Sequence, residues 1–420
     1  MTRSRVAIVG GGPAGLSAAL AVASTGAETI VIDEQPGLGG RLRYQRAPVA
    51  TTDGTIVDPA NLTRHLIAAA GEAGVLLWPG MTAWALFAGN RLALFGAGAP
   101  AELDVDRVIL ATGSTDRPYP FPGGSLPGVF SARAVQLLLN HYRVRPGRRF
   151  VILGNGSPPA EIAADIAAAG GETVAIVPIG EPGVPLLAKG DSGVDRVLID
   201  GEPVEADIVV VAVGRQPDAD LARLAGAEMS WRAEVDSYLV VHGAGGETTV
   251  PGLFVTGDAA GVTDMATALA RGRATGLGAA ASLGLIDADD AGLAAARAAT
   301  STEHDVDGAA SDHRSTISSP VSAMSAQWGT SVERGAAEFL CRCEEVSTAV
   351  ILDAIEAGAR SINDVKRRTR AGMGVCQGCF CTGPIAALLH RRGAISRSGI
   401  DPMTARPPVR LLPLERLSGQ

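Results

Sequence analysis

Apolar runs and glycine-rich turns alternate at the start of the chain. The run VAIV (residues 6–9) leads into GGGPAG, and the small-residue stretch LSAALAVAST separates it from a second run, TIVID (residues 29–33). Short apolar runs bounded by turn signals are typical of buried strands, and the longer stretch between them has the length of a helix. The pattern therefore predicts a strand–helix–strand unit with parallel strands.

Later apolar runs extend this pattern. RVIL (residues 107–110) ends in ATGS, and LFV (residues 253–255) ends in TGD. Between them, residues 148–177 form a second strand–helix–strand pattern, and DIVVVAVGRQP (residues 207–217) closes the region with another strand. Strands that alternate with helices predict an α/β fold with Rossmann-like dinucleotide-binding domains.

The first glycine turn has the spacing of a dinucleotide-binding loop. Gly10, Gly12 and Gly15 form G-x-G-x-x-G between the predicted strand and helix. Gly10 permits the turn, Gly12 lets the backbone approach a pyrophosphate, and Gly15 lets helix and strand pack closely. The expected acid about 20 residues further on is Asp33, with Glu34 beside it. The segment predicts a bound dinucleotide.

The second glycine turn is incomplete. Gly154 and Gly156 occupy the first two positions, but Pro159 replaces the third glycine. The next strand ends in Ile176, Val177 and Pro178 without a carboxylate. Proline is tolerated in the first turn of a helix, so the fold can survive. We expect either a retained scaffold or a site for another nucleotide, and NAD(P), ATP or no ligand all stay open here.

Composition narrows the function classes. Among 420 residues, 36 Lys and Arg stand against 44 Asp and Glu, and the net charge is −8 with no long basic block, which argues against nucleic-acid binding. Residues 6–27 lack charge and imitate a signal peptide, but the glycine triplet and Pro13 interrupt the stretch. We expect it to be core, and the protein to be soluble and cytoplasmic with no membrane span.

All five cysteines lie in one short window near the C-terminus: Cys341, Cys343, Cys376, Cys379 and Cys381. The clustering of the cysteines and their odd number favour a metal site over disulfides. They also indicate a reducing compartment. Two short helices are expected here, with caps at Ser347 and Ser361. Four thiolates suit zinc or an iron–sulfur cluster, and the C-x-C spacing favours the cluster.

The cysteine module resembles the [2Fe-2S] domain of the bacterioferritin-associated ferredoxin type. That pattern is C-x-C, about thirty residues, and a second cysteine pair. The string KRRTRAGMGVCQGCFC is similar to a flavoprotein-fused subset with GMG-x-CQGR-x-C, in which Cys379 takes the place of the arginine. The resemblance implies Cys341, Cys343, Cys376 and Cys381 as ligands, with Cys379 as the alternative fourth ligand.

The segments ATGS and TGDAAG resemble motifs of two-dinucleotide-domain flavoproteins. That resemblance implies FAD, with Asp258 as a flavin ligand; without it, Asp258 could equally be the cap of the helix through MATALARGRATG. The implied FAD-binding residues are Gly10, Gly12, Pro13, Ala14, Gly15, Asp33, Glu34, Gly40, Arg41, Ala111, Thr112, Gly113, Gly257, Asp258 and Ala266.

The expected organisation follows. Residues 1–117 and 250–285 form the FAD-binding domain, 118–249 a degenerate second dinucleotide-binding domain, 286–335 a linker, 336–395 the small helical [2Fe-2S] domain, and 396–420 a Pro/Arg tail. His304 and His313 in the linker are expected to be solvated loop residues. The tail is not expected to form a core; it is either a docking strap for a partner or a disordered end.

The whole chain resembles the FAD-containing α subunit of multisubunit amine dehydrogenases. That family includes opine (octopine and nopaline) oxidases, hydroxyproline and dye-linked proline dehydrogenases, and hydrogen cyanide synthase. The resemblance implies a flavin-containing β subunit that oxidises the amino acid, with a small third subunit allowed, while this chain transfers electrons. No cysteine precedes Cys341, so no dithiol can lie beside the flavin in the first domain. The alternatives are an NAD(P)H-dependent flavin and iron–sulfur reductase and a zinc-bearing, nonredox interaction module.

Overall fold

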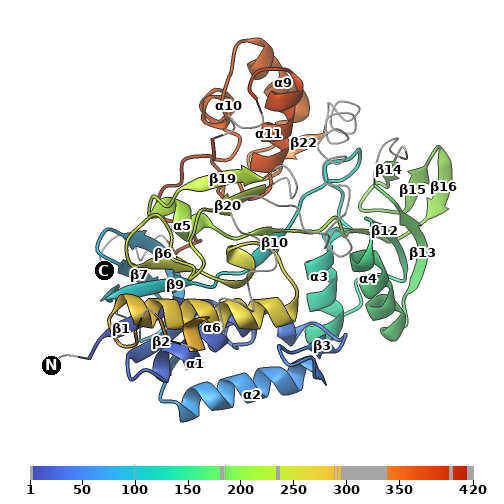
Figure 1. Cartoon of the computed structure of the whole chain (residues 1–420). Coiled ribbons are helices and arrows are strands. Elements are labelled where there is room, and N and C mark those ends of the chain that lie inside the picture. Colours follow the sequence, from blue (N-terminus) through green and yellow to red (C-terminus); the bar gives the residue numbers. More distant parts are fainter. Residues whose placement is uncertain are drawn as a thin grey trace.

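A computed structural model describes residues 3–98, 100–179, 184, 186–232, 237–287, 289–290, 292–294, 338–396 and 401–413. Two α/β units lie side by side, and the cysteine domain packs across them (Figure 1). The expected α/β class and the small helical C-terminal domain are confirmed. Most of the predicted linker, with His304 and His313, falls outside the described residues.

The first unit is a five-stranded parallel sheet in the order β21-β9-β1-β2-β5. Its strands are β1 (Arg5–Val9), β2 (Glu28–Asp33), β5 (Leu76–Pro79), β9 (Arg107–Leu110) and β21 (Leu253–Val255). Helices α1 (Pro13–Ala23), α2 (Pro59–Glu72) and α6 (Met265–Ser282) accompany it. Because Gly272 and Gly276 have no side chains, α6 lies directly against α1: an added Cβ at these positions would come 2.2 Å from Ala14 O and 2.5 Å from Ala18 O.

The second unit is a four-stranded parallel sheet in the order β11-β17-β12-β13. Its strands are β11 (Val129–Ser131), β12 (Arg149–Leu153), β13 (Glu172–Val177) and β17 (Ile208–Val211). Helices α3 (Ala132–Gln136) and α4 (Ser157–Ala168) pack on it, and the π-helical turn η2 (Leu137–His141) continues α3. An antiparallel sheet of β14 (Leu186–Lys189), β15 (Arg196–Ile199) and β16 (Glu202–Glu205) completes the unit.

Shorter elements connect and cover these sheets. They are β3 (Val49–Ala50), β4 (Ile56–Val57), β6 (Thr82–Phe87), β7 (Arg91–Phe95), β8 (Glu102–Asp104), β10 (Ser114–Asp116), β18 (Arg215–Pro217), β19 (Met229–Arg232), β20 (Ser237–Val240), α5 (Asp220–Leu224), η1 (Gly40–Arg43) and η3 (Gly257–Ala259). Strands β10 and β18 pair antiparallel and form a ribbon between the two units.

The cysteine domain contains one more helix than the sequence predicted. Strands β22 (Phe339–Cys341) and β23 (Val346–Ser347) precede α9 (Thr348–Glu356), α10 (Ile362–Thr369) and α11 (Thr382–Arg391). The predicted caps are confirmed, because the hydroxyls of Ser347 and Ser361 accept backbone N–H groups of α9 and α10. Helix α11, which follows the last cysteine, supplies Ile385, Leu388 and Leu389 to the domain core.

The described part of the tail, residues 401–413, corrects the prediction that it forms no core. Met403 is 1% exposed and belongs to the core of the cysteine domain, and Val409 is 6% exposed and packs into the core of the first unit. Val409 N also donates to Trp84 O at 3.0 Å. The segment therefore ties the cysteine domain to the first unit of its own chain.

The uncharged N-terminal stretch is core, as predicted. It forms β1 and α1, and most of its side chains are buried. Among the described residues, no helix has both the length and the apolar character needed to cross a membrane.

Candidate functional site

The carboxyl ends of four neighbouring strands bring most of the predicted flavin residues together. Gly10 follows β1, Asp33 ends β2, Ala111–Gly113 follow β9, and Gly257–Asp258 follow β21. Parallel strands place these ends at one edge of the sheet, where ligands of α/β proteins bind. Gly40 reaches the same edge, because a Cβ on Gly40 would lie 3.0 Å from Gly12 Cα.

The three glycines of the first loop have different spatial roles. A Cβ on Gly10, whose φ is +112°, would lie 2.1 Å from Ala111 O, and one on Gly15 would lie 1.9 Å from Gly10 O. The positive φ of Gly10 fits its predicted role in the turn, and the close contact at Gly15 fits its predicted role in packing. A Cβ on Gly12 would meet nothing closer than 3.8 Å. The space beside Gly12, at the N-terminus of α1, is therefore open to a pyrophosphate, so the loop fits the dinucleotide.

The two adjacent acids at the end of β2 lie in different surroundings. Asp33 is buried, and its two carboxylate oxygens accept the backbone N–H of Gly11 at 2.7 Å and of Gln35 at 2.8 Å. Burial raises the pKa of Asp33 despite these bonds. The Glu34 side chain is 51% exposed, with Arg410 3.6 Å away. Asp33 thus holds the loop, and Glu34 is the acid accessible to a ribose.

Asp258 is the centre of a buried charged network. One carboxylate oxygen accepts from Ser114 Oγ at 2.8 Å and from Arg215 Nη1, and Arg41 Nη1 lies 4.0 Å away. Burial alone would raise the pKa of Asp258, but Arg215 and Arg41 lower it overall. Burial and the neighbouring Arg215 lower the pKa of Arg41. Two guanidinium groups face this carboxylate, and Glu161 also interacts electrostatically with both of them.

The alternative role of Asp258 as the cap of α6 is wrong. Asp264 is the N-cap, and its carboxylate accepts the backbone N–H of Thr267 at 2.9 Å. Asp258 instead accepts the N–H of Thr263 at 3.1 Å, in the turn before the helix. Ala266 lies in the first turn of α6. The carboxylate of Asp258 therefore belongs to the charged network of the site and not to the cap of the helix.

Four of the five thiols form a continuous set. Cys341 Sγ lies 3.9 Å from Cys343 Sγ, and Cys343 Sγ lies 3.5 Å from Cys376 Sγ. The Cys381 thiol donates to Cys341, which lowers the pKa of Cys341 to about 5 and raises that of Cys381. No three His, Cys, Asp or Glu side chains in the described part of the chain converge on a single metal-ion position. Four sulfur donors spread in this way fit a [2Fe-2S] cluster, whose usual ligands are four cysteines.

Cys379 points to a different place. Its Sγ lies 3.5 Å from Thr115 Oγ1, and its carbonyl accepts Gln216 Nε2 at 2.8 Å. Burial raises the pKa of the Cys379 thiol to about 11. The side chain is thus directed at the β10–β18 ribbon, while Cys341, Cys343, Cys376 and Cys381 contact one another.

The basic run at the end of α10 consists of Lys366, Arg367, Arg368 and Arg370, and its three arginines are paired with acids. Arg368 Nε lies 3.4 Å from Asp364, and Arg370 Nε lies 3.1 Å from Glu344. These exposed arginine pairs are typical of a solvated helix face. Lys366 differs from them, because its side chain interacts electrostatically with Cys381.

The second glycine loop is connected to the segment after β13 by one of its own side chains. The Asn155 amide oxygen accepts Ile179 N at 3.0 Å, and its Nδ2 donates to Ile179 O. This bridge joins the loop of Gly154 and Gly156 to the end of β13, where a dinucleotide-binding unit would present its ribose acid. Pro159 lies in the first turn of α4, as predicted.

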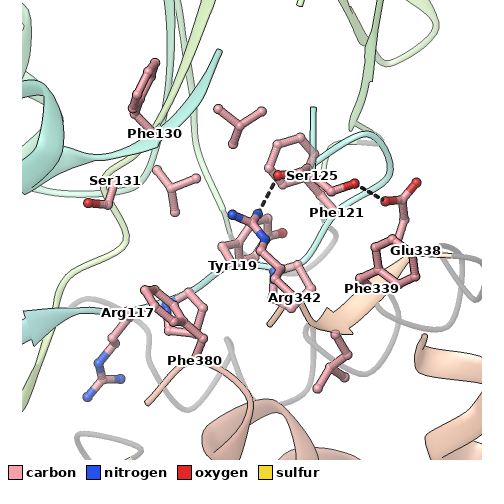
Figure 2. A pocket seen from close by; sticks show the side chains of 16 residues that line it. Arg117, Tyr119, Phe121, Ser125, Phe130, Ser131, Glu338, Phe339, Arg342 and Phe380 are labelled. Atoms are coloured by element: carbon pink, nitrogen blue, oxygen red, sulfur yellow. Dashed lines mark hydrogen bonds between the residues drawn. The ribbon is translucent and has the colours of Figure 1, made fainter. Parts of the chain in front are cut away.

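The cysteine domain also contacts the second unit along a cleft of about 60 Å³ (Figure 2). Glu338 accepts Gly123 N at 3.1 Å and Ser125 Oγ at 3.3 Å, and Arg342 Nη2 donates to Gly124 O. Aromatic side chains line the cleft from both sides: Tyr119, Phe121, Phe130, Phe339 and Phe380. The cysteine domain is therefore held on two sides, by this loop and by the ribbon.

Sequence reasoning missed several polar residues of the site. Ser114 and Arg215 contact Asp258, Thr115 and Gln216 contact Cys379, and Arg410 lies beside Glu34. Ser114 is the last residue of ATGS, and Arg215 lies in DIVVVAVGRQP, so both positions could be read from the sequence. Arg410 had none, because it reaches the site from the tail.

Known proteins resemble this chain over nearly its whole length. An opine oxidase subunit of Rhizobium meliloti (strain 1021) is 28% identical, over 97% of this chain and 96% of that protein. Hydrogen cyanide synthase subunit HcnB of Pseudomonas aeruginosa is 27% identical, over 97% of each. The crystal structure of L-proline dehydrogenase from P. horikoshii superposes with a TM-score of 0.79 at 22% identity, covering 99% of this chain and 80% of that one, which shows a shared fold.

Two family models match the chain. The pyridine nucleotide-disulphide oxidoreductase model matches residues 4–182 and 184–274, and the BFD-like [2Fe-2S] binding domain matches residues 339–391. The cofactors are FAD and a [2Fe-2S] cluster, so the zinc alternative is wrong. The chain is thus a flavin-dependent oxidoreductase that belongs to the pyridine nucleotide-disulphide oxidoreductase family and carries a BFD-like [2Fe-2S] domain.

Proposed function

We propose that this protein is the FAD and [2Fe-2S] electron-transfer subunit of a heteromeric amino acid or opine dehydrogenase or oxidase. Its substrates belong to the class of hydroxyproline, octopine and nopaline. A separate flavin-containing β subunit oxidises the substrate, and this chain accepts the electrons. The observation that carries the proposal is the contact of the cysteine loop with the ribbon that leaves the flavin site.

The similar proteins support a heteromeric assembly. The opine oxidase chain and hydrogen cyanide synthase HcnB are both named as subunits, and this chain covers nearly all of each. A protein that matches such subunits over its whole length is best interpreted as one itself. We infer a cytoplasmic hetero-oligomer that contains the β subunit together with, in some assemblies, a small third subunit.

The proposed sites follow the geometry. Gly10, Gly12 and Gly15 form the pyrophosphate loop, Glu34 binds the ribose, and Asp258 with Arg41 orients the flavin end. Cys341, Cys343, Cys376 and Cys381 hold the cluster. FAD supplies two-electron chemistry when bound, and the cluster supplies one-electron transfer.

Absence of a dithiol separates this chain from disulfide reductases. The sequence has no cysteine before Cys341, so the first unit cannot place a redox-active pair beside the flavin. In the second unit, Pro159 replaces the third glycine of the loop and β13 ends without a carboxylate for the ribose. Both observations favour electron relay over an NAD(P)H-dependent reductase.

An anaerobic absorbance titration with NADH, compared with a dithionite endpoint, tests the relay role. We expect dithionite to bleach the flavin and cluster bands fully, and NADH to leave them unchanged. Stoichiometric bleaching by NADH would instead make the NAD(P)H-dependent reductase the better description.

Coexpression with a β subunit tests the assembly. We expect the two chains to copurify, and amino acid oxidation to require both. Oxidation of an amino acid at the full rate by this chain alone would overturn the two-subunit proposal.

A further inference from the structure

The β10–β18 ribbon separates the flavin site from the cysteine loop. Thr115 pairs with Gln216 across its two strands, and Asp116 pairs with Arg215. Successive side chains of a strand point to opposite faces, and directly paired residues share a face. Thr115 and Gln216 must therefore lie on one face of the ribbon, and Ser114 and Arg215 on the other.

The two faces contact different sites. On one face, Ser114 Oγ and Arg215 Nη1 both donate to the Asp258 carboxylate. On the other face, Gln216 Nε2 donates to Cys379 O at 2.8 Å, and Cys379 Sγ lies 3.5 Å from Thr115 Oγ1. One ribbon, with no intervening element, thus touches both the flavin-site carboxylate and the cysteine loop.

We propose that Thr115 and Gln216 are positioning residues that fix the loop of residues 376–381 against the flavin domain, and that Cys379 is the contact they hold and not a cluster ligand. The inference rests on the proposed function in one respect, because it takes the other four cysteines as the ligands of the cluster.

The local geometry of the loop makes Cys379 an effective point of attachment. It lies between Cys376 and Cys381, and its N–H donates to Cys376 O at 3.0 Å. Gly378 has a φ of +85°, and an added Cβ there would lie 2.8 Å from Thr382 Oγ1. Because the loop is this short and tightly turned, fixing the Cys379 backbone also fixes the two neighbouring thiols.

The main contact with Gln216 is to the Cys379 backbone, since Gln216 Nε2 lies 2.8 Å from Cys379 O and 3.9 Å from Cys379 Sγ. Gln216 donates to the backbone carbonyl of Cys379, so the loop would remain attached in a Cys379→Ala variant, whereas a ligand role would require the sulfur. Replacement of Cys379 therefore separates the two roles.

The test is the rate at which Cys379 in the iron-loaded, full-length protein reacts with iodoacetamide, measured by peptide mass spectrometry. The Cys379 thiol is partly buried, so its reaction rate depends on local opening of its surroundings. Loss of the Gln216 hydrogen bond in Gln216→Leu should increase the labelling rate by about fivefold, since one neutral hydrogen bond contributes on that order. Thr115→Val should give a smaller increase, and Thr115→Ser should restore the wild-type rate.

A matched control removes a hydrogen bond from the other side of the same domain. Ser125→Ala deletes the contact with Glu338 but leaves the ribbon intact, so Cys379 labelling should not change. Iron content and the visible spectrum should equal those of wild type in every variant. Should Gln216→Leu fail to fold, Gln216→Ala removes the same donor.

The outcomes distinguish this inference from the proposed function. Wild-type labelling in the Thr115→Val/Gln216→Leu double variant, with iron retained, would overturn the positioning role and leave the cluster assignment intact. Loss of iron in Cys379→Ala would show that Cys379 is a ligand, which overturns both the four-cysteine assignment and the inference. Faster labelling with full iron content supports the inference.

Discussion

Both strand–helix–strand units connect the glycine loop to the neighbouring strand by a side-chain hydrogen bond. The side chain comes from the strand in the first unit and from the loop in the second. In the first unit, the Asp33 carboxylate at the end of β2 accepts Gly11 N at 2.7 Å. In the second, the Asn155 side chain in the loop reaches Ile179, beyond the end of β13. Both units have a hydrogen bond between the loop and the end of the strand, and its side chain can belong to either the strand or the loop. An acid at the strand end is therefore not by itself a sign of ribose recognition.

The units also differ where the loop enters its helix. Gly10 and Gly154 lie equally close to the backbone that follows a neighbouring strand of the sheet. An added Cβ would lie 2.1 Å from Ala111 O, after β9, at Gly10, and 2.2 Å from Ala212 O, after β17, at Gly154. At the third glycine position, Gly15 packs on Gly10 O, whereas Pro159 places its ring beside Gly154. The strand contact is retained in both units, and only the helix contact has changed.

The largest expected effect comes from filling the tight helix contact of the first unit. Gly15→Ala would place a Cβ 1.9 Å from Gly10 O, and we expect a loss of about 3 kcal/mol in the free energy of unfolding and of most bound FAD. Thermal unfolding and the flavin absorbance per chain measure this.

The control is Gly12→Ala, where the added methyl group would meet nothing within 3.8 Å. It should unfold like wild type but bind FAD more weakly. Equal stability of Gly15→Ala and Gly12→Ala would contradict the assigned packing role of Gly15.

The next effect separates the adjacent acids. Asp33→Asn removes a charged acceptor from two backbone N–H groups and should lower the free energy of unfolding by about 2 kcal/mol. Glu34→Gln should leave stability within about 0.5 kcal/mol of wild type, as for an exposed substitution, while weakening FAD binding. Chemical denaturation and FAD titration of the apoprotein measure the two quantities. If Asp33→Asn bound FAD more weakly without losing stability, Asp33 and not Glu34 would be the acid that binds the ribose.

A smaller effect is expected in the second unit. Asn155→Ala removes both bonds to Ile179 and should cost about 1 kcal/mol in stability, with flavin content unchanged because the first unit is untouched. Denaturant unfolding followed by flavin fluorescence and by circular dichroism would detect the difference. A loss of FAD in this variant would show that the two units are more strongly coupled than we infer.

The smallest effect should follow from restoring the third glycine. Pro159→Gly adds conformational freedom to the unfolded chain and should lower stability by about 0.5 kcal/mol. NADH should still fail to bleach the flavin, because β13 ends without a carboxylate. Reduction by NADH in this variant would identify Pro159 as the one feature that disables the second loop.

Local sequence patterns predicted the fold well but not the contacts between distant segments. Strands β1, β2, β9, β12 and β21 and helices α1 and α4 follow from short apolar runs and glycine spacing. The cap of α6 was also readable, since Asp264 directly precedes the apolar stretch MATALA. Helix α11 was missed although Pro384 and the apolar run IAALL mark it.

The orientation of Cys379 could not be predicted, because it depends on a contact with Thr115, 264 residues away in the sequence. C-x2-C and C-x4-C spacings both allow a fourth ligand, and only the position of the ribbon distinguishes the two thiols. Burial of Met403 was unpredictable for a similar reason: the glycines that make room for it, Gly372 and Gly378, belong to the cysteine domain.

The position of Met403 has a consequence for biosynthesis. The methionine follows the cysteine domain in the chain, yet its side chain fills the core beside the loops of Gly372 and Gly378. Since domains generally begin to fold as they leave the ribosome, the two sheets can assemble during translation. The cysteine domain, however, can complete its core only after residue 403 has emerged, so it can finish folding only after both sheets have left the ribosome.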